Sequence, residues 1–165
     1  MQTSYYCIKY NHAMLFGSFI HNKSFTSALV AYIHYLGIIL CFASLLYERL
    51  TLKVNLSRSE TISMIIADVV YGLAGVALLI TGILRVRYFG QGGDFYTSNP
   101  IFWIKVTLYI IVGLLSLYPT FTYIFWAIPL SKNKLPEISD KLVKRFKLII
   151  TTELIVLPQF LSLQH

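Results

Sequence analysis

The stretch Ile62–Leu84, ISMIIADVVYGLAGVALLITGIL, decides the fold class of this 165-residue chain. Its 23 residues contain a single ionisable side chain, Asp68, and a helix of that length covers the ~30 Å hydrocarbon core of a bilayer. Helix is the favoured conformation, because backbone polar groups in lipid must find their hydrogen-bond partners within the segment itself. The stretch therefore predicts a transmembrane helix.

Three more segments of similar character lie on either side of this stretch. The four predicted spans are Ala28–Glu48, Ile62–Leu84, Ile101–Phe125 and Phe146–Leu163. The last is the shortest and contains Pro158. We predict an all-α integral membrane four-helix bundle over residues 28–165, preceded by an N-terminal tail over residues 1–27. Translation could begin at Met1 or at Met14 within that tail.

The composition supports a lipid environment. Hydrophobic residues make up 56% of the chain and charged residues 13%, against about 25% charged in an average soluble domain. Mean hydropathy is +0.66. A small domain buries only about two-thirds of its surface, so the apolar surplus must face lipid. The two cysteines and the histidines follow no metal-ligand spacing, and no basic run forms a nucleic-acid-binding face.

The basic residues predict an orientation in the membrane. The first and third connections carry Arg49, Lys53, Arg58, Lys132, Lys134, Lys141, Lys144, Arg145 and Lys147. The opposite side carries fewer basic residues, namely Lys9, Lys23, Arg85 and Arg87. The positive-inside rule places the richer side in the cytoplasm, so both termini are predicted to face the periplasm or lumen. The third connection also predicts a basic amphipathic stretch that lies at the membrane surface.

A basic cluster is predicted near the outer surface. His34 lies ~9 Å deep on the first span, and Lys105 enters the third span at the same side. Arg85 and Arg87 end the second span. Ionisable residues inside a membrane are costly and usually face the interior of a helix bundle, so these four residues form one candidate site.

An acidic cluster is predicted on the cytoplasmic side. Asp68 and Glu153 lie ~9–10 Å deep on the second and fourth spans, and Glu48 lies nearer the surface on the first. The three residues are candidates for a proton relay or for a polar cluster that locks helix packing. A purely structural role is the alternative for each of these residues. The carboxyls of Asp68 and Glu153 could be protonated or paired with Arg49 or Arg145, and His34 could be a hydrogen-bonded interior residue.

Several runs carry a resemblance to a known family. They are Ala31–Gly37, Asp68–Gly72, Thr81–Gly90, Gly93–Tyr96, Asn99–Lys105 and Gly113–Thr120. In these runs the chain resembles the domain of unknown function 2214 family of bacterial, often cyanobacterial, membrane proteins. The resemblance covers residues from about Ala28 to the C-terminus. It implies a membrane location, in the bacterial inner membrane or the thylakoid membrane, and implies no activity.

A shorter set of motifs is similar to the four-helix protoporphyrinogen oxidase of bacteria, the HemJ type. The counterparts are His34, Gly37, Phe42-Ala43, Thr81-Gly82 and Lys105. In that family the histidine and the lysine are implicated in haem binding and activity. Together with the basic cluster, this suggests haem b or another tetrapyrrole, with His34 as an axial ligand and Lys105, Arg85 and Arg87 paired with its propionates. The chain departs from that pattern at Cys41, where an aromatic residue is usual, and it has no second histidine within a span.

The sequence is compatible with three functions. The favoured one is an accessory or cofactor-binding subunit of a membrane complex, in contact with the lipid bilayer and with other subunits or further copies of the chain. The alternatives are a haem-binding membrane oxidoreductase and a proton or ion pathway. Hydrolase and phosphate-loop motifs are absent from the sequence, so soluble-enzyme chemistry of those kinds is excluded.

Overall fold

The computed structural model describes residues 23–89 and 97–159. The described elements are α2 (Lys23–Thr51), α3 (Arg58–Leu84), the π-helix η1 (Arg85–Phe89), α5 (Pro100–Ser131) and α6 (Asp140–Val156). No strand occurs in the described residues, so the all-α class is confirmed. Residues 1–22 of the predicted tail lie outside the described residues, and residues 23–27 belong to the first turns of α2.

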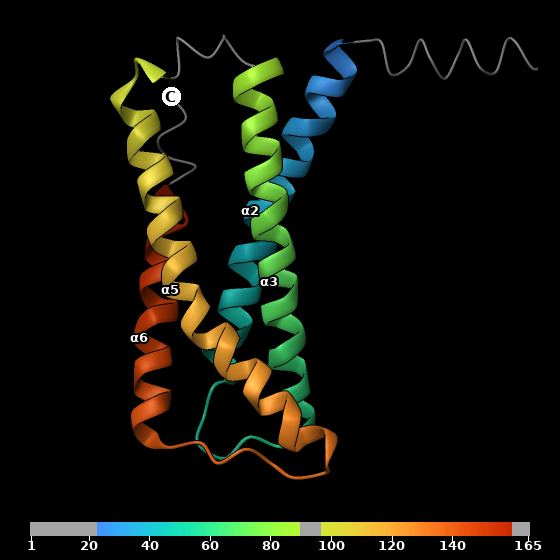
Figure 1. Ribbon diagram of the computed structural model, residues 1–165, viewed down its shortest axis with the longest axis vertical. Helices are drawn as coiled ribbons and strands as arrows, with labels where there is room; N and C mark the ends of the chain where they lie inside the picture. Colours follow the sequence, from blue (N-terminus) through green and yellow to red (C-terminus); the bar gives the residue numbers. More distant parts are fainter. Residues whose placement is uncertain (1–22, 90–96, 160–165) are drawn as a thin grey trace, which may run out of the picture.

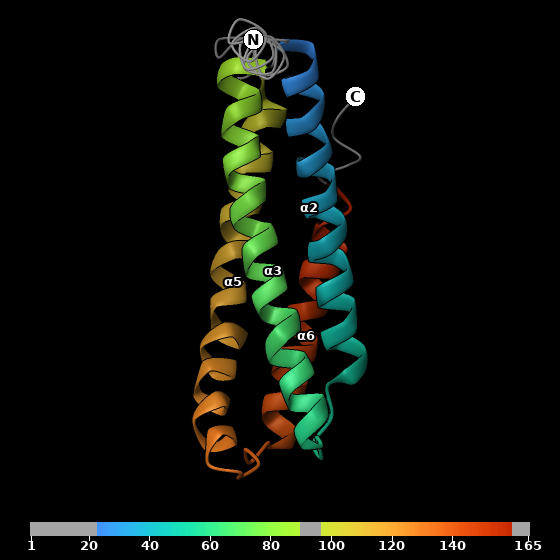
Figure 2. The same cartoon turned by 90° about the vertical axis from the view of Figure 1, so that its right-hand side faces the viewer.

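The four α-helices form an antiparallel bundle. Helix α2 packs most extensively against α3, and the further neighbours α3–α5, α5–α6 and α6–α2 close the ring. Figures 1 and 2 show the α2–α3 and α5–α6 connections at the same end of the bundle. We call this the basic end, after the lysines in those connections and the lysines and arginines in the adjoining ends of the helices. The other end, where α2 begins and α3 ends, is called the histidine end.

Three helices in the described part of the chain are long and apolar enough to cross a membrane. They are α2, α3 together with η1, and α5, with 29, 32 and 32 residues. Helix α6 has 17 described residues and covers the first part of the predicted fourth span. It ends at Val156, two residues before Pro158, which has no backbone N–H to continue the helical hydrogen bonds.

The basic stretch before the fourth span, which is predicted to lie at the membrane surface, is part of a helix of the bundle. It forms the first turns of α6, which begins at Asp140 and runs alongside the other helices (Figure 1). Val143 and Phe146 are buried in the bundle, whereas Lys144 and Arg145 are exposed. The apolar residues recur at helical spacing, and they draw the whole stretch into the bundle.

Local signals set where the helices begin. Ser57 and Glu60 form a capping box at the start of α3, with the Ser57 hydroxyl accepting from the Glu60 amide and the Glu60 carboxylate accepting from the Ser57 amide. Asn99 caps α5 through its side-chain oxygen, 2.9 Å from the Ile101 amide nitrogen, and Pro100 occupies the first turn. The third of the predicted spans therefore lies within a helix that begins at Pro100.

Helix α5 carries two prolines, Pro119 and Pro129. A proline inside a helix removes one backbone hydrogen bond and displaces the preceding turn. Figure 1 shows α5 leaving α6 and running obliquely toward the start of α3 in its second half. Asn133, with φ of 58°, then turns the chain in the left-handed conformation after α5.

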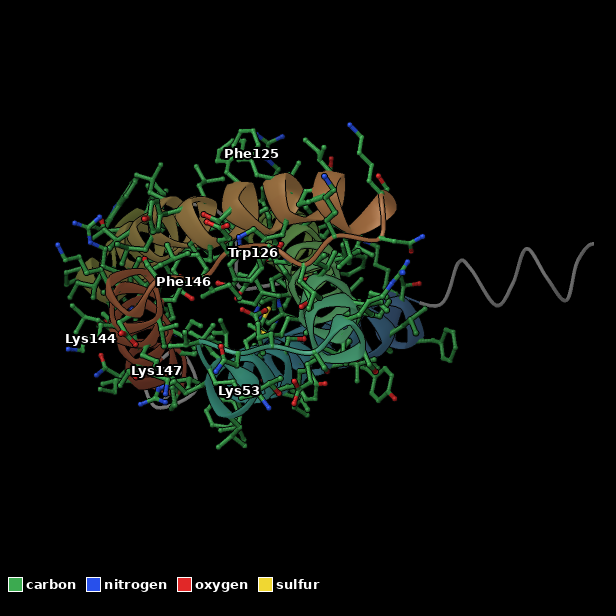
Figure 3. The ribbon with its side chains drawn as sticks, turned by 90° about the horizontal axis from the view of Figure 1, so that it is seen from below. Lys53, Phe125, Trp126, Lys144, Phe146 and Lys147 are labelled. Atoms are coloured by element: carbon green, nitrogen blue, oxygen red, sulfur yellow. The ribbon has the colours of Figure 1, made fainter. Side chains whose placement is uncertain are left out.

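An aromatic core fills the basic end. The ring centroids of Trp126 and Phe146 lie 6.1 Å apart in a stacked pair, and Tyr123 meets both rings edge-on at 5.3 and 5.6 Å. Figure 3 shows Trp126 and Phe146 inside the bundle, with Phe125 directed away from it. All three core rings are nearly inaccessible, so this layer seals the basic end below the polar interior.

Gly37 sets the closest approach of α2 and α3. A Cβ atom at this position would lie 3.0 Å from Leu78 Cγ and 3.4 Å from the Ala74 carbonyl oxygen. Small residues permit such contacts where lipid provides no hydrophobic drive for association. At Gly72, Gly75 and Gly113 an added Cβ would meet nothing within 4 Å, so the close approach is specific to Gly37.

Candidate functional site

Three carboxyl side chains from three helices are buried inside the bundle. Glu48 on α2 is 1% exposed, Asp68 on α3 is 7% exposed and Glu153 on α6 is fully buried. The charges of Asp68 and Glu153 both act on Glu48, and that of Asp68 acts on Glu153. The structure thus brings the predicted acidic residues together, and we call them the carboxyl cluster.

Helix α5 supplies hydroxyl groups to two of the three carboxyls. The Tyr123 hydroxyl donates to Glu48 Oε2 at 3.1 Å, and the Thr120 hydroxyl donates to Asp68 Oδ1 at 2.8 Å. All four α-helices therefore contribute to one polar centre. Neither the bond from Tyr123 to Glu48 nor that from Thr120 to Asp68 is visible in the sequence, because each joins residues more than fifty positions apart in the chain.

Glu153 has no hydrogen-bond partner in the described part of the structure. Both of its carboxyl oxygens, together with Glu48 Oε1, are buried and unpaired. Burying a charged group without a partner is expensive, and most buried polar groups in proteins are hydrogen-bonded. An unsatisfied group of this kind marks a place where a proton or another ligand is exchanged, or where stability is given up for function.

The predicted ion pairs with Arg49 and Arg145 do not form in the described residues. Arg49 Nε instead donates to the Thr151 hydroxyl at 3.0 Å, and Arg145 is exposed on the outer face of α6. The salt bridge among the described residues joins Lys53 and Glu60 at 2.6 Å, outside the interior. The interpretation of Glu153 as half of an interhelical salt bridge is therefore wrong.

Further polar groups continue from the carboxyl cluster toward the histidine end. Cys41, a buried free thiol, donates to the Tyr71 carbonyl oxygen at 3.8 Å, and the charge of Glu153 acts on both Cys41 and the Tyr71 side chain. Ser116 lies beside the Tyr71 hydroxyl. The Tyr109 hydroxyl donates to the Gly75 carbonyl oxygen at 2.9 Å, and Leu78 then packs against Gly37 at the next level.

His34 occupies a second polar site beyond this apolar contact. Its Nδ1 atom lies 2.9 Å from the Thr81 hydroxyl oxygen, and that hydroxyl donates its own proton to the Ala77 carbonyl oxygen at 2.6 Å. These two contacts favour the tautomer in which the Thr81 hydroxyl accepts from Nδ1–H. The lone pair of the neutral ring is then on Nε2, the arrangement that a metal-ligating histidine uses.

Two of the three predicted cations surround His34. The charges of Arg85 and Lys105 act on the imidazole, and the Arg85 guanidinium lies 5.6 Å from the Tyr35 ring centroid. Arg87 is exposed in η1, and no described contact joins it to His34. The π-helical turn carries both arginines, and π-helical turns are common at functional sites. We call His34, Thr81, Arg85 and Lys105 the histidine site.

A family model matches most of the chain. The DUF2214 family, described as a predicted membrane protein, matches residues 26–163, which include both sites. The chain belongs to the DUF2214 family. The predicted resemblance to this family is thus confirmed, and with it a membrane location for the bundle. No curated protein and no solved structure matches the chain. The similarity to the HemJ-type oxidase stays a prediction.

The DUF2214 chain holds its carboxyl cluster and its histidine site in different layers. The carboxyl cluster lies toward the basic end and the histidine site at the other, with the Gly37–Leu78 contact between them. Within residues 23–89 and 97–159, no three His, Cys, Asp or Glu side chains are placed to hold a metal ion. The family member therefore offers acid–base groups at one site and an oriented imidazole at the other.

Proposed function

We propose that this DUF2214 protein binds and transfers protons within the membrane, with the carboxyl cluster as the relay. Glu153 carries the proposal, because it is fully buried and both of its oxygens lack a partner. A buried carboxyl without a partner is stable only when it carries a proton and is neutral. Chains of acidic side chains inside membrane proteins typically mark proton relays.

A proton fits the cluster better than the other ligands that carboxyls bind. The geometry among the described residues does not gather three metal-ligating side chains. The three carboxyls come from α2, α3 and α6, so a proton placed on one lowers the repulsion felt by the others. The hydroxyls of Tyr123 and Thr120 each hold one oxygen of Glu48 and Asp68 in place. Glu153 is left as the free acceptor.

Passage across the whole bundle would require movement of α2 against α3. Polar groups extend from Glu48 to Cys41 and Tyr71, but the Gly37–Leu78 contact separates them from His34. The Tyr109 hydroxyl, which donates to the Gly75 carbonyl oxygen, is the last polar group before that contact. Protons would cross only when this contact opens and the aromatic core at the basic end admits them. We therefore expect slow, gated transfer instead of the fast flux of an open channel.

Proton flux into liposomes tests the proposal. The full chain is reconstituted in vesicles that contain a pH-sensitive dye, and a potassium gradient with valinomycin supplies the driving potential. We expect the vesicle interior to acidify faster with the protein than in empty vesicles, and we expect this difference in rate to be lost in Glu153→Gln. Glu137→Gln is the matched control, because Glu137 is an exposed residue of the α5–α6 connection.

Two results would contradict the relay. One is wild-type flux equal to that of protein-free vesicles at every applied potential. The other is equal flux in Glu153→Gln and the wild type, which would place any conduction elsewhere in the bundle. Circular dichroism of each variant establishes that the helices are intact before flux is compared.

The histidine site favours a second function, the binding of a tetrapyrrole. The supporting observation is the Thr81–His34 hydrogen bond, which leaves the Nε2 lone pair for an axial bond. Arg85 and Lys105 supply the cations that would pair with propionates. His34 would hold such a group through Nε2, and Arg85 and Lys105 would lie near its carboxylates. A bound haem would supply one-electron chemistry, and the protein would hold and orient the ring.

Absorption spectra of the purified protein test this second function. After addition of haemin, we expect a Soret band that is lost in His34→Ala and shifted in Thr81→Val, which removes only the orienting hydrogen bond. Arg87→Gln is the control, because Arg87 is a basic residue that does not contact His34. An unchanged spectrum of free haemin in the wild type, or an equal band in His34→Ala, would end this proposal.

The accessory-subunit role and the placement in a bacterial inner or thylakoid membrane remain predictions. Exposed apolar side chains cover the outer faces of α2, α3 and α5 and suit either lipid or another membrane subunit. Isolation of the full chain from its native membrane tests the role. A partner present in fixed stoichiometry supports it, and recovery of the chain by itself argues against it.

A further inference from the structure

A groove opens between the start of α3 and the end of α5, at the basic end. Its volume is about 300 Å³, and its walls are predominantly apolar. The lining residues are Arg58, Ile62, Ile65, Ile66, Ala127, Leu130 and Ser131. Their spacing along each helix, three or four residues apart, places them on one face of α3 and one face of α5. The groove plays no part in the carboxyl cluster or the histidine site.

Positive charge gathers at the mouth of the groove. Arg58 lines it in the first turn of α3, and its guanidinium donates to the Asn133 side chain just beyond α5. Lys132 and Lys134 are exposed on either side of Asn133. The nearest acid along α3, Glu60, is paired with Lys53. The mouth therefore presents cations, and no carboxyl lines the groove.

The groove runs into the hydrocarbon layer. Ile66 lies eight residues beyond Arg58, which is ~12 Å along a helix, compared with ~30 Å for the full hydrocarbon core. Ile62 and Ile66 are 39% and 56% exposed, so their side chains are open to whatever occupies the groove. A cationic mouth at the headgroup level and an apolar channel below it match the two parts of a phospholipid.

We propose that this groove binds one anionic phospholipid, with its phosphate at Arg58 and one acyl chain against Ile62, Ile66 and Ala127. Charge complementarity selects an anionic lipid over a zwitterionic one, because a second positive group on the headgroup would face Arg58 and the two lysines. Guanidinium and phosphate form short, charge-assisted hydrogen bonds, so Arg58 is the main specificity-determining residue.

Native mass spectrometry of the full chain in detergent tests the proposal. Phosphatidylglycerol and phosphatidylcholine with the same acyl chains are added in parallel, and the bound fraction is compared over a concentration series. We expect one phosphatidylglycerol to be retained at least ten times more tightly than phosphatidylcholine. The preference is lost in Arg58→Gln. Ala127→Trp weakens binding of both lipids, because the indole ring fills the groove without changing its charge.

Matched variants separate this site from general attraction to anionic lipid. Lys141→Gln removes an equal charge from the exposed face of α6, and Ala43→Trp adds an equal ring to an exposed position on α2. Both controls are expected to bind phosphatidylglycerol as the wild type does. Equal losses in Arg58→Gln and Lys141→Gln, or wild-type binding in Ala127→Trp, would overturn the proposal. Either result is independent of proton flux and haem binding.

Discussion

At the scale of single residues, the burial of Glu153 lowers the stability of the fold and has no explanation in the packing of the helices. Its neighbours on the inner face of α6, Phe146 and Ile150, are fully buried apolar side chains. An apolar residue at position 153 would continue that stripe. The carboxyl instead stands unpaired in the interior, close to Glu48 and Asp68. Stability is commonly sacrificed in this way at functional sites.

We predict that Glu153→Met raises the stability of the protein while it abolishes proton transfer. Methionine has a similar shape and needs no hydrogen bonds, so the cost of the unsatisfied carboxyl, about 1–3 kcal/mol, is removed. Thermal unfolding in detergent, followed by circular dichroism, measures the change. Glu48→Met is the comparison, because it leaves the buried Tyr123 hydroxyl without its hydrogen-bond acceptor, so the stability should rise less than in Glu153→Met. A lower melting temperature in Glu153→Met would contradict the prediction.

At the scale of the helices, the α2–α3 hairpin is the frame on which both candidate sites are built. Its two helices pack more extensively than any other pair, and Gly37 allows their backbones to approach. Helix α2 then carries both His34 and Glu48, fourteen residues apart on the same inward face. That separation of about four turns puts one residue in each polar layer. Helix α3 supplies the partner residues Thr81 and Asp68.

We predict that Gly37→Val destabilises the hairpin by about 1–3 kcal/mol, since the added side chain overlaps Leu78 and must push the helices apart. The double variant Gly37→Val/Leu78→Ala should recover part of this loss. Gly72→Ala is the control, because an added Cβ there meets nothing within 4 Å. Thermal unfolding of the wild type, the single variants Gly37→Val and Leu78→Ala, and the double variant measures the coupling between positions 37 and 78. Additive effects of the two substitutions would refute the close contact.

At the scale of the whole molecule, the two ends of the bundle differ in charge and in the kind of site they hold. The basic end gathers the lysines and arginines of two connections around an aromatic core (Figure 3). The histidine end has fewer cations, and Arg85 and Lys105 lie beside an imidazole. This asymmetry gives the bundle a direction relative to the membrane potential and to the charged lipid surface.

We predict that the basic end faces the cytoplasm, and with it that both termini face the opposite side. Single cysteines in a Cys7→Ser/Cys41→Ser background test this with a membrane-impermeant maleimide. Ser98→Cys, at the histidine end, should be labelled in intact cells. Lys134→Cys, at the basic end, should be labelled only after permeabilisation. Both positions are exposed in the structure, so access depends on the membrane alone. The opposite pattern would reverse the orientation.

The sequence by itself determined the class of fold and the inward faces of the helices. Long apolar segments in lipid can satisfy their backbones only as helices, and helical periodicity assigns Gly37, Cys41, Ser44 and Glu48 to one buried face of α2. The start of α5 at Asn99-Pro100 is equally local, because capping depends on adjacent residues. These features follow from spacing along a single segment.

Only the tertiary structure decided how the polar residues are partnered. The bonds from Tyr123 to Glu48 and from Thr81 to His34, and the absence of a partner for Glu153 in the described residues, depend on the rotation and relative height of neighbouring helices. The sequence suggested Arg49 as a partner for an interior carboxyl, but its guanidinium meets Thr151. Periodicity fixes which face of a helix turns inward, whereas the contacts between helices arise only once four such faces pack against each other.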